Sequence, residues 1–233
     1  MRCRWPVCVS DIRTRRRRNC GGVLRICISV LSWRSKSTGP YMNAEQSEVN
    51  LTVAGAFDRL RIPYFLGGSM ASSVHGIYRA TNDADFIADF RVENVKPFVD
   101  ILGPAFYAFE PAIREAVFSR RSFNVIHQDT MLKADVFVMK PDPFSASQME
   151  RRILVPLGPT PAPSLYLASP EDTVLSKLDW YRQTGSTSDR QWSDILGVLK
   201  VQGHRLDRPY LLDWAEKLQL SGLLERALKD AAL

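Results

Sequence analysis

The pattern of apolar and polar residues predicts a chain that mixes helix and strand first and ends in helices. An apolar stripe with helical spacing runs through residues 45–61 and stops before Pro63. Ser169 followed by Pro170 is a typical helix start. Short apolar runs between turn residues predict strands at 62–66, 83–90, 123–127 and 132–139. Further helices are predicted at 91–102, 110–118, 170–181, 188–201, 209–218 and from 223 to the end.

This order of elements predicts an α+β protein with a small mixed sheet, flanking helices and a helical C-terminal part. We divide the chain into a basic leader at 1–41, a core at 42–160 that contains the predicted strands, and a helical subdomain at 161–233. The helical part is expected to close one wall of a cleft.

The first candidate for chemistry is the turn Gly67-Gly68-Ser69. It follows an apolar run and opens a small-residue segment that can continue as a helix. A strand that passes through glycines into a helix start leaves free backbone N–H groups at the positive end of the helix dipole, which suits phosphate. Two other interpretations remain: a plain structural turn, and the nucleophile of a hydrolase. The hydrolase interpretation leaves the acidic pair described next without a role.

Asp83 and Asp85 form that acidic pair. Because side chains alternate along a strand, both carboxylates point to one face while Ala84, Phe86 and Ala88 point to the other. Two carboxylates near a phosphate site suit Mg²⁺, which favours carboxylate and phosphate oxygens. The bland alternative is a solvated strand end.

A third carboxylate, Asp135, lies 52 positions after Asp83 inside the apolar strand 132–139. Carboxylates are rarely buried unless they are paired or bind a metal. Lys133, on the same strand face, is the alternative partner. Together with the pair, Asp135 is a candidate metal ligand.

Residues 42–233 resemble the DNA polymerase beta-type nucleotidyltransferase superfamily, and within it the minimal nucleotidyltransferases related to AbiEii abortive-infection toxins. The resemblance rests on Gly67-Gly68-Ser69, on Asp83-Ala84-Asp85 preceded by Arg79-Ala80-Thr81, and on Asp135. A fourth motif is matched in part. Lys177 and Asp194 fit it, but Gln191 follows Arg190 where an aspartate is expected.

The resemblance implies transfer of a nucleoside monophosphate from an NTP to a hydroxyl on RNA, protein or a small molecule, and several proteins with this pattern are the toxin of a toxin–antitoxin pair. It implies that Ser69 and the glycines hold the terminal phosphates and that Arg79 and Lys177 neutralise their charge. Asp83, Asp85 and Asp135 would bind two Mg²⁺ ions, and Asp135 would also help to deprotonate the acceptor. The alternative is a catalytically weak binding module that acts through a protein partner such as an antitoxin, since the fourth motif is incomplete.

Several of these residues have structural alternatives. Arg79 and Lys177 could be surface charges, and Asp194 could pair with Arg190 four residues earlier on its helix. His75, at a predicted helix end, is expected as a cation beside the last carbonyls. The helically spaced aromatic residues are expected to pack between helices rather than to stack on a base: Trp180, Tyr181 and Trp192.

The charge and the cysteines are concentrated in the leader. Residues 1–41 hold ten basic residues and one acidic residue, a net charge of +9, whereas the other 192 residues hold 21 basic and 24 acidic residues, a net charge of −3. We expect an extension upstream of a start at Met42; a transit peptide and an RNA-binding arm are the alternatives. All four cysteines lie in this leader, so residues 42–233 contain none and have no disulfide framework. We therefore expect a reducing compartment, the cytoplasm. No apolar run approaches the roughly 18 residues that cross a bilayer.

Overall fold

The computed structural model describes residues 44–157 and 162–233. The described residues all belong to one compact unit, Gly39–Leu233. The predicted leader at 1–41 lies outside the described residues. In the described part of the chain, no helix has the length and apolar composition needed to cross a membrane.

Seven strands of the described chain form one mixed sheet in the order β3-β4-β5-β2-β1-β7-β6. The pairs β2–β5 and β1–β7 are parallel, and the other neighbours are antiparallel. The α+β class with a mixed sheet is therefore confirmed. The strands are β1 (Tyr64–Leu66), β2 (Ala84–Ala88), β3 (Phe106–Tyr107), β4 (Ser122–His127), β5 (Lys133–Val138), β6 (Ile153–Pro156) and β7 (Ser164–Leu167).

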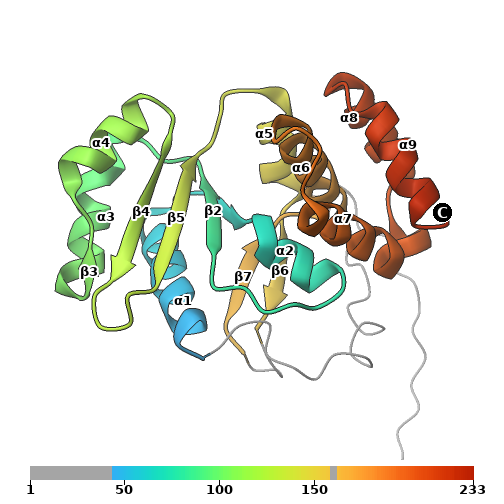
Figure 1. Ribbon diagram of the computed structural model, residues 1–233. Helices are drawn as coiled ribbons and strands as arrows, with labels where there is room; N and C mark the ends of the chain where they lie inside the picture. Colours follow the sequence, from blue (N-terminus) through green and yellow to red (C-terminus); the bar gives the residue numbers. More distant parts are fainter. Residues whose placement is uncertain (1–43, 158–161) are drawn as a thin grey trace, which may run out of the picture. The chain divides into compact units, whose positions relative to one another are not determined.

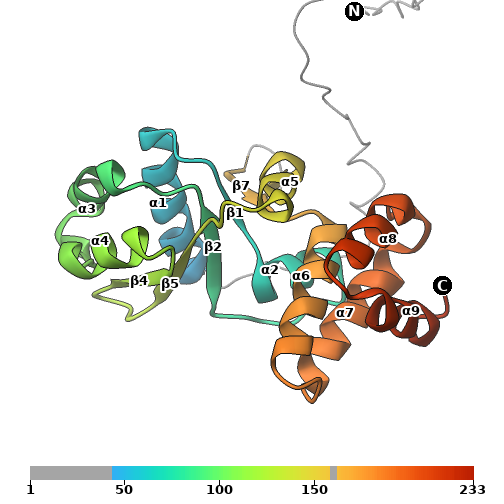
Figure 2. The ribbon, with the colours of Figure 1, turned by 90° about the horizontal axis from the view of Figure 1, so that it is seen from above.

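The helices form two groups on either side of the central strands (Figures 1 and 2). One group lies beside β3, β4 and β5: α1 (Ala44–Leu60), α3 (Val95–Leu102) and α4 (Glu110–Phe118). The other lies beyond β1 and includes α2 (Gly68–His75), α6 (Pro170–Gln183), α7 (Asp189–Gln202), α8 (Arg208–Lys217) and α9 (Ser221–Asp230). The remaining elements are α5 (Pro143–Arg151) and three short 3₁₀ turns, η2 (Val92–Asn94), η3 (Gly103–Ala105) and η4 (Gly203–Arg205).

Most predicted elements are present with small shifts at their ends. The helix predicted at 91–102 begins as the turn η2, because the Asn94 side chain accepts a hydrogen bond from the backbone N–H of Arg91 at 3.0 Å. The predicted cap of α6 is also found: Ser169 Oγ accepts from the N–H of Asp172 at 3.1 Å. The sequence patterns did not predict β3, α5, β6 or β7. Because β7 pairs with β1 and β6, the sheet extends past residue 160, and the helical part begins at Pro170.

Aromatic side chains fill the space between the sheet and the first helix group. Phe57 of α1 stacks on Phe98 of α3 with ring centroids 5.2 Å apart, and it meets Phe86 of β2 edge-on at 5.5 Å. All three rings are fully buried. Since Phe86 points to this core, its strand neighbour Asp85 points to the opposite face, as the alternation of buried residues in β2 confirms.

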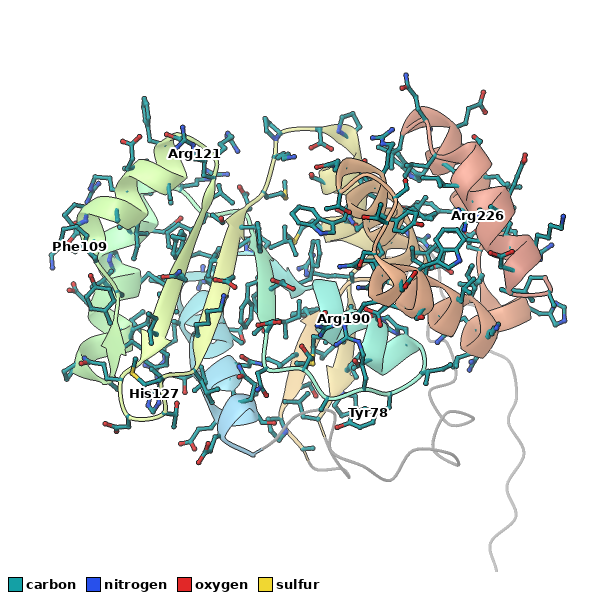
Figure 3. The ribbon with its side chains drawn as sticks, in the orientation of Figure 1. Tyr78, Phe109, Arg121, His127, Arg190 and Arg226 are labelled. Atoms are coloured by element: carbon teal, nitrogen blue, oxygen red, sulfur yellow. The ribbon has the colours of Figure 1, made fainter. Side chains whose placement is uncertain are left out.

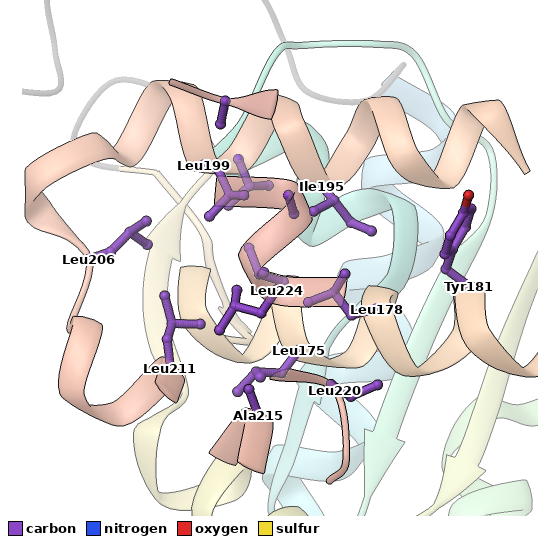
Figure 4. Close-up of a cluster of buried hydrophobic side chains, with 14 residues drawn as sticks. Leu175, Leu178, Tyr181, Ile195, Leu199, Leu206, Leu211, Ala215, Leu220 and Leu224 are labelled. Carbon is purple, nitrogen blue, oxygen red and sulfur yellow. The ribbon is translucent and has the colours of Figure 1, made fainter. Parts of the chain in front are cut away.

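The C-terminal helices have an apolar core of their own (Figure 4). Leu175 and Leu178 of α6 are completely buried against Ile195 and Leu199 of α7 and Leu224 of α9. Burial of such side chains stabilises a fold by roughly 1.5–3 kcal/mol each. This core packs α6 against α7, and both helices also pack on α2.

Candidate active site

The site is built on the turn that joins β1 to α2. Gly67, directly after β1, donates its backbone N–H to the carbonyl of Asp85 on β2 at 2.9 Å. Gly68 has a left-handed backbone with φ of +53°, and a Cβ placed there would lie 1.9 Å from Asp85 Oδ2. A side chain at position 68 is therefore excluded both by the backbone and by the carboxylate. The glycine allows α2 to begin directly beside Asp85.

We predict that Gly68→Ala lowers the free energy of unfolding by about 2–4 kcal/mol, because the new methyl group must displace Asp85 in addition to straining the backbone. Gly103→Ala is the matched control. Gly103 also has a positive φ, of +61°. A Cβ added there would have no atom within 4 Å other than those of its chain neighbours. That variant is expected to cost about 1 kcal/mol. If urea unfolding shows the same loss of free energy for both variants, the close contact between position 68 and Asp85 is contradicted.

Asp83 and Asp85 occupy the start of β2. Asp83 precedes the strand, and its N–H donates to Thr81 Oγ1 at 3.3 Å. The Asp85 side chain lies on the face opposite the aromatic core. Burial raises the pKa of Asp85 above its usual range, and the negative charges of Asp135 and Asp83 raise it further. A nearby cation would stabilise the ionised form of Asp85, because its positive charge offsets both the burial and the repulsion from the other carboxylates.

Asp135 lies opposite Asp85 in the parallel pairing of β2 with β5. Residues paired across neighbouring strands present their side chains on the same face, so Asp135 joins the acidic pair. One Asp135 oxygen, Oδ2, accepts a hydrogen bond from Lys133 Nζ at 2.8 Å. The cavity in front of these carboxylates has a volume of about 340 Å³, and its lining consists of Ser69, Asp83, Asp85, Lys133, Asp135, Arg190 and Gln191.

These carboxylates have the hard oxygen donors that Mg²⁺ prefers. Within residues 44–157 and 162–233, no three Asp, Glu, His or Cys side chains are grouped as a ready metal site. The Lys133 ammonium occupies one Asp135 oxygen. Asp83, Asp85 and Asp135, which line one cavity, are the residues that would hold such a cation.

A charged network lies next to Ser69. It joins three residues from separate segments of the chain: Arg79, Lys177 and Asp194. Arg79 donates to both Asp194 oxygens at 2.8 Å and to Ser69 Oγ at 2.7 Å. Lys177 Nζ donates to Asp194 Oδ2 at 2.8 Å and to Gln191 Oε1 at 2.9 Å. Two cations on one carboxylate leave a net positive charge beside the glycine turn.

Burial and pairing set the charge state of this network. Burial alone would raise the pKa of Asp194, but the hydrogen bonds from Arg79 and Lys177 outweigh it and lower the pKa to about 2. Burial lowers the pKa of Lys177, and the bond to Asp194 partly restores it. Asp194 is therefore ionised at neutral pH and holds both cations in place.

The network corrects one expectation and adds two residues. Asp194 does not pair with Arg190 on its own helix, because Arg79 and Lys177 occupy both of its oxygens. Arg190, in the first turn of α7, instead lines the carboxylate cavity (Figure 3). Gln191, which departs from the expected motif, accepts from Lys177. Two sequence signals pointed to this region: the partly matched fourth motif, which contains Arg190 and Gln191, and the N-cap Ser188 at the start of α7.

The expectation for His75 was wrong. It lies in the last turn of α2 but is 5% exposed, and its Nε2 is 2.8 Å from the carbonyl oxygen of Ala168. Burial lowers the pKa of His75 to about 4, so the ring is neutral at pH 7 and donates to Ala168. It links α2 to the segment between β7 and α6.

We therefore predict that the protein loses stability between pH 6.5 and 4. The unfolded chain takes up a proton on His75 near pH 6.5, whereas the folded chain resists protonation down to about pH 4. Stability from the neutral ring is complete above pH 6.5 and falls by up to about 3 kcal/mol as the pH drops through that window. In His75→Gln this part of the pH dependence of urea unfolding is expected to disappear. His204→Gln, at an exposed histidine, should retain it.

Two of the three aromatic residues pack between helices as expected. Tyr181 and Trp192 lie with ring centroids 5.1 Å apart, and the Arg226 guanidinium lies 4.4 Å from the centroid of the Trp192 ring. Trp180 does not follow this pattern: it is 55% exposed on α6.

Comparison with known proteins finds similarity only among solved structures. No protein-family model matches the chain, and no curated protein matches it. The solution structure of the antibiotic-resistance factor ANT(2'')-Ia is similar at 13% identity over 80% of this chain and 95% of that chain, with a TM-score of 0.44. An antigenic nucleotidyltransferase-like protein from Paracoccidioides brasiliensis is similar at 17% identity over 80% and 93%, with a TM-score of 0.47.

A CCA-adding enzyme in complex with ATP is similar at 11% identity over 74% of this chain and 48% of that chain, with a TM-score of 0.35. The chain thus spans about half the length of that enzyme. All three TM-scores are below 0.5 and all three identities below 20%, so the function of this chain has to be argued from its own residues.

Proposed function

We propose that this protein is a Mg²⁺-dependent nucleotidyltransferase that moves a nucleoside monophosphate from an NTP to a hydroxyl acceptor. The observation that carries the proposal is the pairing of Asp85 with Asp135 across parallel strands, in one cavity with Asp83 and Ser69. Bound Mg²⁺ would supply charge stabilisation for the phosphates and the attacking oxygen. The three carboxylates are the residues that would hold it.

The residues around the cavity suit a triphosphate. The Gly67-Gly68-Ser69 turn offers the backbone N–H groups of Gly68 and Ser69 at the start of α2, whereas the N–H of Gly67 is bonded to Asp85. Arg190 lines the cavity, and Arg79 bonds Ser69 Oγ. Lys177 belongs to the same network through Asp194. In the proposed reaction, the acceptor oxygen bonds to the α-phosphorus while the bond to the pyrophosphate oxygen breaks. Asp135 takes the acceptor proton.

The first experiment is incubation of the protein with each of the four α-labelled NTPs, Mg²⁺ and either total tRNA or cell lysate. We expect label to appear on an RNA, a protein or a small molecule, and the labelled species identifies the acceptor. Labelling should stop with EDTA and in the Asp83→Ala/Asp85→Ala variant. Equal labelling by this variant and the wild type would exclude the proposed site.

A second candidate is a binding module, and one observation favours it. Groups proposed to bind metal or phosphate already have partners within the protein: Lys133 pairs with Asp135, and Arg79 donates to Ser69 Oγ. In this case the protein would act through a partner, as in a toxin–antitoxin pair of the AbiEii type. Calorimetry separates the two candidates. NTP binding that requires Mg²⁺ and Asp135 supports the enzyme, whereas tight binding of a co-purified protein that is unchanged in Asp135→Asn supports the module.

A further inference from the structure

A second cavity, with a volume of about 200 Å³, lies at the opposite end of β1 from the glycine turn. It opens beside Tyr64, the first residue of the strand, and shares no lining residue with the carboxylate cavity. Two arginines from distant segments line it, Arg61 after α1 and Arg152 after α5. The proposed nucleotidyl transfer gives this cavity no role.

Arg152 has a buried donor without a partner. Its guanidinium carbon lies 4.8 Å from the centroid of the Tyr166 ring, which also lines the cavity. Its Nη1 donates to the carbonyl of Met149, but its Nε is buried and makes no hydrogen bond within the described residues. Buried polar groups are nearly always paired. The Nε–H of Arg152 is a donor that the described residues leave unpaired, as is the Nε–H of Arg151, which does not line this cavity.

Arg61 stands where a glycine is usual. It is the residue after α1, with φ of +54°, and the N–H of Ile62 bonds the carbonyl of Phe57 at 2.9 Å. This is the helix-terminating turn in which glycine is favoured, because a side chain strains the left-handed backbone. Within the described part of the chain, the Arg61 side chain forms no ion pair and no hydrogen bond. Arg61 therefore occupies a strained backbone position and lines the cavity.

Asp58 is the single carboxylate among the residues that line the cavity, and it does not neutralise the arginines. Burial raises the pKa of Asp58, and no neighbouring cation lowers it. In the described residues, neither Arg61 nor Arg152 forms an ion pair with it. The two guanidiniums thus give the cavity a net positive charge.

We propose that this cavity binds a small phosphate monoester, with the phosphate held by Arg61 and Arg152. Guanidinium groups match phosphate oxygens in pairs, and two of them balance a dianion. The volume of about 200 Å³ is several times the roughly 30 Å³ that one water occupies, so it accommodates a phosphate together with a sugar-sized body. Tyr64 and Tyr166 provide the wall for that body.

The test is calorimetric titration of the full chain with ribose 5-phosphate, with ribose as the uncharged comparator. We expect the ester to bind and ribose not to bind. Arg61→Gly should weaken ester binding about tenfold or more, while its thermal midpoint stays equal or rises because glycine suits the turn. Asp58→Asn is the matched control: it removes a charge of opposite sign, so affinity should stay equal or increase.

Ser69→Ala separates this cavity from the carboxylate site, because phosphate held by the glycine turn would be lost in that variant while binding beside Tyr64 would be retained. Arg152→Lys should also weaken binding, since lysine keeps the charge but loses the paired N–H groups. The proposal is overturned if the ester does not bind up to about 10 mM, if Arg61→Gly binds like the wild type, or if Ser69→Ala abolishes binding.

Discussion

Replacing Asp85 by asparagine is expected to lower the rate of nucleotidyl transfer by about 10³-fold, which corresponds to about 4 kcal/mol of transition-state stabilisation. The substitution keeps the size of the side chain and removes its charge. Asp85 is the carboxylate that faces both Asp83 and Asp135, so its loss weakens the proposed cation site from the centre. The measurement is kcat/KM for label transfer, together with Mg²⁺ affinity by calorimetry.

Asp129→Asn provides the control, because Asp129 is an exposed aspartate in the turn between β4 and β5. It should retain the wild-type rate. Asp85→Asn also removes repulsion between carboxylates, so the folded protein should be as stable as the wild type or more stable. Loss of activity with retained stability therefore assigns the effect to the site. Wild-type activity of Asp85→Asn would remove the basis of the proposed function.

The second large effect is expected for Asp194→Ala, which should lower the free energy of unfolding by about 3–5 kcal/mol. Lys177 is 5% exposed and would keep only the Gln191 oxygen as its partner. An uncompensated buried ammonium is costly, whereas Arg79 is partly exposed and can be hydrated. Urea unfolding measures the loss.

A second change tests this explanation. Adding Lys177→Met to Asp194→Ala removes the stranded charge and should recover part of the lost stability. Asp213→Ala is the matched control, because it breaks the surface pair between Asp213 and Lys217; it should change stability by less than about 0.5 kcal/mol. If Asp194→Ala and Asp213→Ala lower the free energy of unfolding equally, the buried pair between Lys177 and Asp194 does not stabilise the fold more than a surface pair does.

The sequence was sufficient where a pattern lies within one element. The spacing of apolar residues predicted α1 and α4, and the Ser-Pro start predicted α6. The same kind of reasoning, applied to alternation along a strand, placed Asp85 on the face opposite Phe86. These features depend on backbone periodicity and on side chains a few residues apart, so a local pattern contains the needed information.

Short or weakly patterned elements escaped this reasoning. α5 is a polar helix whose start is fixed by Asp142, which accepts from the N–H of Ser145 at 2.9 Å. Asp142 followed by Pro143 is a helix-start pattern that could have predicted α5 from the sequence. β7 has four residues, and its place beside β1 depends on a sheet that other segments form first.

By itself, the sequence determined most of the helices, the central strands, the glycine turn and the face on which Asp85 lies. Only the tertiary structure decided which charges meet. Arg79 is 115 residues from Asp194, and Asp135 faces Asp85 through the register of two strands 50 residues apart. Such pairings depend on how whole elements pack. For the same reason, only the fold could bring Arg61 and Arg152 to one cavity.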